Sequence, residues 1–271
     1  SFQDIQLRGP QAMRIPLYQI DAFADQPFTG NPAAICPLQT WLDDATMQNM
    51  AMENNLSETA FFVGENGKYD LRWFTPGSEV DLCGHATLAS AHVIFNRLEP
   101  TQDKLTFSTK SGDLVVTRQG DLMEMNFPAR PPEAMEANAV LMQALGGNPA
   151  LALQSRDYFV VYETQAEVAA LTPDFTAMAR LEKWATIVTA PGDNCDFVSR
   201  FFAPGEGIDE DPVTGSAHCT LIPYWADRLG KSEMLARQIS ARGGELHCRF
   251  EGDRVAIAGK AREVLVGEFL L

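Results

Sequence analysis

The sequence predicts an α+β protein made of two equivalent halves. The first observation is an internal repeat, because four residues return 128 positions later in the chain: Arg72, Phe74, Pro76 and Gly77 match Arg200, Phe202, Pro204 and Gly205. The second observation is that each copy reads as a strand, a Pro-Gly turn, a polar loop and an amphipathic helix. A chain of 271 residues is long enough for two cores of moderate size, so a duplicated half fits its length.

The repeat continues after a three-residue insertion in the second copy. At an offset of 131, the residues Glu79, Gly84, Ala86, Arg97 and Leu98 match Glu210, Gly215, Ala217, Arg228 and Leu229. At the same offset, His85 meets Ser216 and Cys83 meets Thr214. At an offset of 132, Gly112, Leu114 and the turn Gly120-Asp121 match Gly244, Leu246 and Gly252-Asp253. We therefore divide the chain into 13–127 and 128–261, with the C-terminal strand 262–271 as a candidate to complete the first half.

Composition excludes several classes of partner. The 21 Lys and Arg against 36 Asp and Glu give a net charge of −15, which argues against nucleic acid and anionic membranes. Five scattered cysteines and four histidines form no metal-ligand pattern, so we expect no metal and a reducing, cytoplasmic location. Residues 1–12 lack the features of a signal peptide, and no apolar run reaches membrane length. We interpret 1–12 as a leader that precedes a natural start at Met13.

The elements of the first half follow from local patterns. Alternating residues predict a strand at 15–23, and a turn at 27–32 leads to a short strand at 33–36. Asp43 or Asp44 can cap a helix that ends near Asn54. Further strands are predicted from about 59, at 71–74, 105–108, 113–119 and 122–127, with the first central helix at 84–98.

The second half starts after a proline-rich linker at 128–132. Helices are predicted at about 133–145, 163–171, 173–181 and 215–229, and strands at 157–162, 185–189, 195–202 and 263–271. Pro223 falls inside the second central helix. It must kink that helix or lie where a neighbour satisfies the carbonyl that loses its helical donor.

The two central helices begin alike, at Gly84 and Gly215. A helix start offers unpaired backbone N–H groups and a partial positive charge, and glycine lets an anion approach that backbone closely. Either glycine alone is explained by a tight turn. Both in a duplicated frame indicate one site, in which a small carboxylate lies between the helix starts.

Four further side chains are candidates for chemistry, and each has a plain structural alternative. Glu58 lies before an apolar strand, where the charged form of a carboxylate is disfavoured, so it could carry protons; otherwise it is a solvent-exposed loop residue. His85 could hold or trade a proton, or bond loop backbone. Asp211 and Ser216 could contact an anionic substrate, or act as ordinary turn and helix-start residues.

Asn31 and Cys83 complete the candidates. We expect Asn31 to hold loop backbone first and to contact substrate second. The thiol of Cys83 beside a helix start could act as a base, but its counterpart Thr214 cannot be a second thiol. Packing beneath the loop is the alternative for Cys83. A hydrolase nucleophile at Ser216 is disfavoured, because no G-x-S-x-G motif surrounds it.

Four motifs together resemble the phenazine biosynthesis PhzF-like isomerase family. They are Thr-Gly-Asn-Pro at 29–32, Asn-Leu-Ser-Glu-Thr at 55–59, Cys-Gly-His-Ala-Thr at 83–87 and Asp-Pro-Val-Thr-Gly-Ser-Ala at 211–217. The resemblance covers 13–271 and implies a diaminopimelate epimerase-like fold. In that fold, each half is a curved, mostly antiparallel sheet wrapped around a central helix, with the site in the cleft between the halves.

The resemblance also implies roles for individual residues. Glu58 would be the catalytic proton carrier, with no metal or organic cofactor, in a protein that is commonly a homodimer. The residues that line the substrate would be His85, Asp211 and Ser216, with Asn31 in the surrounding loop and N–H groups from Gly84 and Gly215. Cys83 stands where the epimerases keep one catalytic cysteine, whereas Pro212 occupies the position of the other.

Three hypotheses for function follow. In the first, the protein is an isomerase in which Glu58 moves a proton and a double bond on a small carboxylate. In the second, it is an epimerase or racemase that uses Cys83 with a partner other than a thiol. In the third, it binds a small metabolite without turnover. The sequence does not name the substrate.

Overall fold

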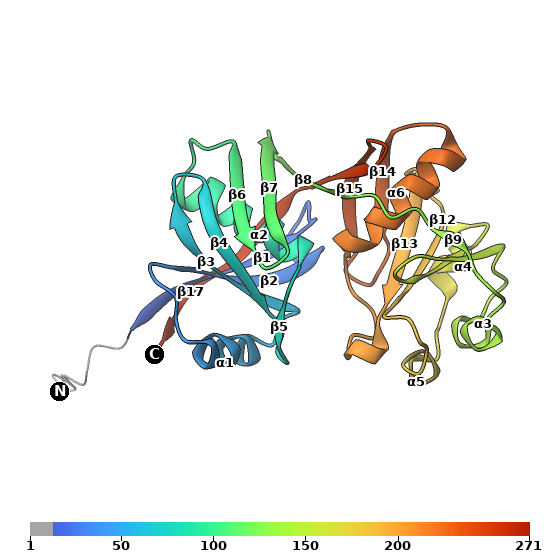
Figure 1. Cartoon of the computed structure of the whole chain (residues 1–271), viewed down its shortest axis with the longest axis horizontal. Coiled ribbons are helices and arrows are strands. Elements are labelled where there is room, and N and C mark those ends of the chain that lie inside the picture. The colour runs from blue at the N-terminus through green and yellow to red at the C-terminus, as the bar shows by residue number, and fades with distance from the viewer. Residues whose placement is uncertain (1–12) are drawn as a thin grey trace, which may run out of the picture.

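The computed structural model describes residues 13–271, so the predicted leader at 1–12 lies outside the described residues. Figure 1 shows two lobes side by side, with β8 and the last strands running between them. The first lobe contains β1 (Arg14–Ala22), β2 (Asn31–Leu38), α1 (Asp44–Asn54), β3 (Glu58–Glu65), β4 (Lys68–Phe74), β5 (Glu79–Val80), α2 (Gly84–Val93), a π-helical turn (Ile94–Leu98), β6 (Lys104–Thr109), β7 (Gly112–Gln119) and β8 (Leu122–Pro128).

The second lobe follows the linker. It contains β9 (Glu133–Ala134), α3 (Ala139–Leu145), β10 (Leu151–Gln154), β11 (Tyr158–Val161), α4 (Gln165–Ala170), α5 (Phe175–Met178), β12 (Thr186–Pro191), β13 (Phe197–Phe202), a 3₁₀ turn (Pro204–Glu206), α6 (Gly215–Leu229), β14 (Glu233–Gln238), β15 (Gly244–Phe250) and β16 (Arg254–Gly259). The last strand, β17 (Ala261–Leu270), returns to the first lobe, where it pairs with β1.

Three predicted helices of the second lobe were too long. The helix predicted at 133–145 is wrong in its first half, because Glu133 and Ala134 pair with β10 as a short strand. Asn138 caps α3 by accepting a hydrogen bond from the backbone N–H of Leu141, so the helix cannot start earlier. The helices predicted at 163–171 and 173–181 shrink to α4 and α5, which are capped by Thr164 and Asp174.

The sheet registers repeat as the sequence does. In the first lobe Val116 of β7 pairs with Met125 of β8, and in the second Cys248 of β15 pairs with Ile257 of β16, which is a shift of 132 in both strands. The junction between the lobes is the pair β8 and β16, in which Met125 lies opposite its own counterpart Ile257. Such self-pairing places the pseudo-twofold axis at this point.

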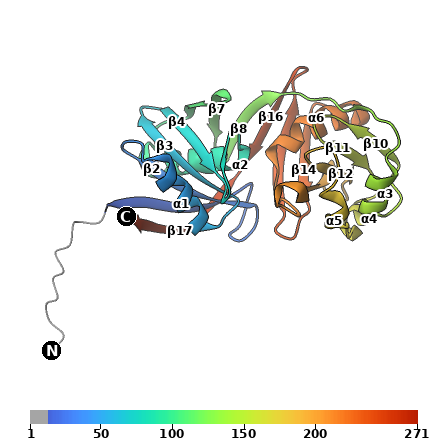
Figure 2. The same cartoon turned by 60° about the horizontal axis from the view of Figure 1, so that its bottom comes forward.

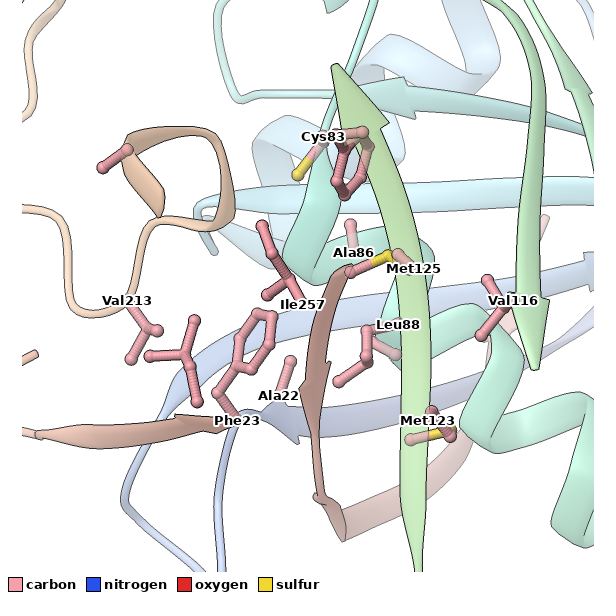
Figure 3. Packing of buried hydrophobic residues seen from close by; sticks show 14 of the residues in the cluster. Ala22, Phe23, Cys83, Ala86, Leu88, Val116, Met123, Met125, Val213 and Ile257 are labelled. Carbon is pink, nitrogen blue, oxygen red and sulfur yellow. The ribbon is translucent and has the colours of Figure 1, made fainter. Parts of the chain in front are cut away.

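Side chains from both lobes pack at this junction. Figure 3 shows Phe23, Val213 and Ile257 close together, with Met125 on the neighbouring strand. Phe23 is 1% exposed and Val213 is fully buried. A Cβ atom added to Gly259 would lie 2.3 Å from the Phe23 ring, so only glycine fits there. The two lobes therefore share one hydrophobic core cluster.

The C-terminal strand belongs spatially with the N-terminal one. β17 pairs antiparallel with β1 from Ala22 opposite Ala261 to Arg14 opposite Leu270. Figure 2 shows the two strands side by side at the outer end of the first lobe.

The linker between the lobes packs on α6, because the backbone N–H of Arg130 donates to the Cys219 carbonyl at 2.8 Å. Cys219 is four residues before Pro223, so the linker satisfies the carbonyl that the proline leaves without a helical donor.

Each lobe holds its central loop with the same ion pair. The Arg72 guanidinium makes two hydrogen bonds to Glu79, at 2.7 and 2.9 Å, and Arg200 makes two to Glu210, at 2.8 and 2.9 Å. Both pairs join a strand to the loop that leads into a central helix.

Among residues 13–271, no helix combines the length and the apolar character needed to cross a membrane.

Candidate active site

The two central helices start against each other. A Cβ atom added to Gly84 would lie 3.8 Å from the Cα atom of Gly215, and the reverse addition gives 3.9 Å. Each helix also closes its first turn in the same way: the Thr87 hydroxyl donates to the Cys83 carbonyl at 2.6 Å, and Nδ1 of His218 lies 2.8 Å from the Thr214 carbonyl. Neither Cys83 nor Thr214 caps its helix with its side chain, so backbone N–H groups of both first turns stay available.

Glu58 and His85 face each other beside these helix starts. α1 ends at Asn55 in the left-handed conformation, and β3 begins at Glu58, which fixes the place of its carboxylate. Oε2 of Glu58 lies 3.1 Å from Nε2 of His85, and the two side chains are 13% and 7% exposed. The distance fits an ion pair, but the angles miss those of a hydrogen bond. Both atoms thus lack a hydrogen-bond partner among the described residues.

The other face of His85 meets Cys83. The Cys83 sulfur lies 3.4 Å from Nδ1 of His85. Burial alone would lower the pKa of His85, but Cys83 and Glu58 together outweigh burial and raise that pKa well above its usual value. Burial raises the pKa of the Cys83 thiol. In this arrangement, the imidazole of His85 lies between the Cys83 sulfur and the Glu58 carboxyl group.

Asp211 lies in a hydrogen-bonded network that crosses the junction. Nδ2 of Asn31, from the first lobe, donates to Oδ1 of Asp211 and to the Val213 carbonyl, both at 2.9 Å. The Thr214 hydroxyl donates to Oδ2 of Asp211 in a short bond. Burial raises the pKa of Asp211 to about 6, although His85 and the Thr214 hydrogen bond act to lower it. Both oxygens of Asp211 are thus occupied, in contrast to Oε2 of Glu58.

Two site residues had no signal in the sequence. Gln238 of β14 donates to the Asp211 carbonyl at 2.8 Å and accepts from the Thr214 backbone N–H at 2.8 Å, so it holds the loop before α6. Arg156 donates to the Ser216 hydroxyl at 3.2 Å. Each lies far in sequence from the residues that it contacts. Only the strand pairing of the second lobe brings them together.

Glu58, Cys83 and His85 are also a possible ligand set for a metal ion, because one donor atom from each lies within 4.8 Å of the others. Thiolate, imidazole and carboxylate are ligands that suit zinc. However, the sulfur and the carboxylate face different nitrogens of the ring. The imidazole of His85 thus has a different neighbour at each of its two nitrogens.

The strand register identifies which residue of the second lobe corresponds to Glu58. Thr59 pairs with Phe74 in the first lobe, and Thr186 pairs with Phe202 in the second. Because Phe74 and Phe202 are repeat counterparts, Thr59 corresponds to Thr186 and Glu58 to Ala185. Cys83 corresponds to Thr214 by the repeat. The second lobe thus carries neither a carboxylate nor a thiol at these positions.

Comparison with known proteins agrees with this architecture. The family model for phenazine biosynthesis-like protein (PhzC-PhzF) matches residues 20–267. An uncharacterized isomerase of Pseudomonas aeruginosa is 52% identical, over 94% of this chain and 98% of that protein. The crystal structure of a PhzF-family phenazine biosynthesis protein from Enterococcus faecalis superposes with a TM-score of 0.94 at 48% identity, covering 96% of this chain and 100% of that one.

A more distant structure relates the fold to epimerases. A hydroxyproline epimerase from Agrobacterium vitis, with bound trans-4-hydroxy-L-proline, has a TM-score of 0.58 at 9% identity, covering 97% of this chain and 93% of that one. At that identity the likeness concerns the fold alone. The predicted α+β fold of two sheet-and-helix halves is confirmed, and the chain belongs to the phenazine biosynthesis-like (PhzC-PhzF) protein family.

Proposed function

We propose that the protein is an isomerase that moves a proton, and with it a double bond, on a small carboxylate-bearing metabolite. The observation that carries the proposal is the buried Oε2 of Glu58, which accepts no hydrogen bond within 13–271, lies 3.1 Å from Nε2 of His85 and stands beside two helix starts that meet. The names of relatives as isomerases support the class of reaction. Glu58 is the proposed proton carrier. Asp211, with both oxygens hydrogen-bonded, is the proposed holder of the substrate-binding loop.

Substrate binding follows from the paired helix starts. Backbone N–H groups in the first turns of α2 and α6, from Gly84 to His85 and from Gly215 to Ser216, can donate to one carboxylate. The partial positive ends of both helices attract the same group. Side chains at Gly84 and Gly215 would occupy this space, so glycine there keeps the backbone accessible.

The proposed reaction conserves protons and electrons. Glu58 takes a proton from a carbon conjugated to the substrate carboxylate, and the electron pair of that C–H bond spreads towards the carboxylate. The two helix starts stabilise the negative charge that develops there, and the imidazolium of His85 adds a positive charge beside it. Glu58 then returns the proton to a second carbon. Because Ala185 stands at the position equivalent to Glu58, both transfers take place on one face of the substrate.

Deuterium labelling separates the three hypotheses. In deuterated water, the proposed isomerase places solvent or substrate deuterium at a new carbon. An epimerase would label the carbon from which the proton was taken, and a binding protein would label none. The contact of 3.4 Å between Cys83 and His85 is the observation that keeps the epimerase as the second candidate. Mass spectrometry and NMR of the recovered substrate give the position of the label.

The substrate can be sought by thermal stabilisation. A ligand present at 100 times its dissociation constant adds about 2.7 kcal/mol to the free energy of unfolding. Small cyclic and amino carboxylates are the first compounds to screen, since the proposed site binds a carboxylate. Each hit then enters the labelling experiment, first with the wild type and then with Glu58→Gln. Glu58→Gln should still bind the hit but exchange no deuterium.

We also propose that the protein acts as a homodimer in the cytoplasm. The family resemblance supports the dimer, and the ribbon of β1 and β17 leaves Leu265, Val266 and Leu270 exposed at 47%, 57% and 60%. The five cysteines, all free in the described chain, support a reducing compartment. Light scattering at micromolar concentration tests the dimer. A monomer mass at all concentrations would contradict it.

A further inference from the structure

The guanidinium group of Arg156 is fixed in place with one side left open. Arg156 lies in the turn between β10 and β11, and its Nε and Nη2 make hydrogen bonds to Asp157 at 2.9 and 2.8 Å. The carboxyl of Asp157 is 2% exposed, so this edge is buried. The face of the guanidinium lies 4.7 Å from the ring centre of Trp184. Nη1 makes no hydrogen bond to any residue of 13–271, and the side chain is 38% exposed.

Arg200 uses the donors of its guanidinium group differently from Arg156. Arg200 uses one edge for Glu210 and directs Nη1 to the carbonyls of Val168 and Leu171, at 3.1 and 2.9 Å. All three nitrogens of this guanidinium group donate to groups within the protein. Arg156 has a buried carboxylate on one edge and an indole on its face, which hold it rigid. A rigid guanidinium with free donors is suited to a planar anion.

The guanidinium group of Arg156 lies next to the proposed substrate site. Nη2 of Arg156 also donates to the Ser216 hydroxyl, in the first turn of α6. Thr59 corresponds to Thr186 through the strand registers, so Trp184 occupies the position equivalent to Ser57, directly before Glu58. Arg156 stacks on Trp184, so its guanidinium group lies beside the second lobe's counterpart of the position before Glu58.

The surroundings of Arg156 are positive in a strongly negative protein. Nζ of Lys183 donates to the Ser155 carbonyl at 2.8 Å and lies 5.9 Å from the Tyr158 ring centre. Burial raises the pKa of Cys219 in α6, and the guanidinium groups of Arg130 and Arg156 both act against that shift, which places both near this helix. With a net charge of −15 overall, such a cluster provides local attraction for an anion.

We propose that Arg156, held by Asp157 and Trp184, binds a second anionic group of the substrate, so that the substrate class is a dianion such as a dicarboxylate. The first carboxylate lies at the two helix starts, and the second pairs with the open side of Arg156. This inference rests on the proposed function for the position of the first carboxylate. It adds a residue that determines specificity.

Two pairs of compounds test the inference, each differing by one carboxylate: benzoate against isophthalate, and butyrate against glutarate. Binding is measured by calorimetry on the full chain at pH 7 and fixed ionic strength. We expect the wild type to bind the dicarboxylate of at least one pair roughly tenfold or more tightly, the scale of a charge-assisted hydrogen-bonded pair. Arg156→Gln and Arg156→Lys should reduce that preference without changing the monocarboxylate affinity.

The controls separate binding from folding and from catalysis. Arg228→Gln removes one exposed positive charge from the far end of α6 and should leave the preference unchanged. Arg156→Lys keeps a charge opposite Asp157, so it tests the inference even where Arg156→Gln does not fold. No preference in the wild type for either dicarboxylate, or an equal loss for both members of a pair in Arg156→Lys, would overturn the inference. If the preference holds but Glu58→Gln still exchanges deuterium, the inference stands and the proposed function fails.

Discussion

The two lobes share a frame but differ in the groups that the frame presents. Both have a strand, an ion-paired loop and a central helix that starts with glycine, and the pairs Arg72 with Glu79 and Arg200 with Glu210 are alike in geometry. The first lobe adds a cluster of three titratable side chains, Glu58, Cys83 and His85. The second has Ala185, Thr214 and Ser216 at those positions, and Arg156 beside them.

The difference shows which part of the site the duplication provides. Two helix starts around one axis are a symmetric device, and they suit a carboxylate, whose two oxygens are equivalent. Proton transfer needs no such symmetry. A two-base epimerase would need a base on each face of the substrate, whereas this site keeps its free carboxylate oxygen on one side. We propose that the first lobe provides the proton-transfer groups and that the second lobe provides the additional substrate contact.

The largest expected effect separates the two acids of the site. Glu58→Gln should lower kcat by about 10² to 10⁴, the range for a general acid or base. Asp211→Asn should lower kcat less than about tenfold, because the amide oxygen can still accept from Asn31 and the amide N–H can donate to the Thr214 hydroxyl oxygen. Steady-state kinetics with the substrate found by screening provide the measurement. Glu53→Gln, on the exposed surface of α1, is the matched control, and equal losses in the two site variants would contradict the division of roles.

The next effect concerns the first turns of the central helices, where His218 corresponds to Thr87. His218 is fully buried, and burial lowers its pKa to about 4. The unfolded state therefore binds more protons between pH 6.5 and 4, so stability falls as pH decreases through this window. Relative to His218→Thr, the wild type should lose about 3 kcal/mol from pH 7 to pH 4.

Urea unfolding of both proteins at several pH values measures this loss. Asp211, whose pKa is raised to about 6, contributes the opposite slope in both proteins and cancels in the difference. Identical pH dependence of the wild type and His218→Thr would show that the buried imidazole is protonated as easily as a free one.

A smaller effect compares the two ion pairs. Arg72→Met leaves Glu79 with a second cation, since Nζ of Lys110 lies 2.7 Å away. Arg200→Met leaves Glu210 without its partner and also frees the carbonyls of Val168 and Leu171. We expect Arg200→Met to reduce the free energy of unfolding by about 2 kcal/mol more than Arg72→Met. Chemical denaturation measures both, and a larger loss for Arg72→Met would show that the bonds from Arg200 to the Val168 and Leu171 carbonyls do not provide the expected extra stability.

The smallest expected effect is at Cys83. A serine there keeps a donor near Nδ1 of His85, as Thr214 provides a hydroxyl at the equivalent position. Cys83→Ser should reduce kcat by a few-fold, the size of one modest hydrogen bond of about 1 kcal/mol. Complete loss of turnover in Cys83→Ser would instead assign Cys83 as the base of an epimerase, provided that the wild type places the label at the original carbon.

The repeat in the sequence predicted most of what the two lobes have in common. The offset of 132 returns in the registers of β7 with β8 and of β15 with β16. Of the two alternatives predicted for Pro223, a kink or a neighbour that satisfies the freed carbonyl, the linker provides the second. Cys83 is buried, as expected for packing beneath its loop, and it also faces His85. Asn31 holds loop backbone as expected, but the carbonyl that accepts its hydrogen bond is that of Val213, in the other lobe.

The differences between the lobes could not be predicted, because they lie where the repeat has diverged. Only the strand registers identify Ala185 as the counterpart of Glu58, because the matching residues of the repeat begin later in the chain, at Arg72. Arg156 and Gln238 reach Ser216 and Asp211 across many intervening residues. The helix predicted at 133–145 failed because an edge strand next to β10 overrode its local helical pattern.

The bond from the Arg130 N–H to the Cys219 carbonyl limits how the protein can move. A connector between lobes normally serves as a hinge, and a mid-helix proline normally permits bending. Here the same hydrogen bond immobilises the connector and braces the helix at its weakest turn. Movement of the connector relative to α6 would have to break this bond, so residue 130 is fixed to the second lobe.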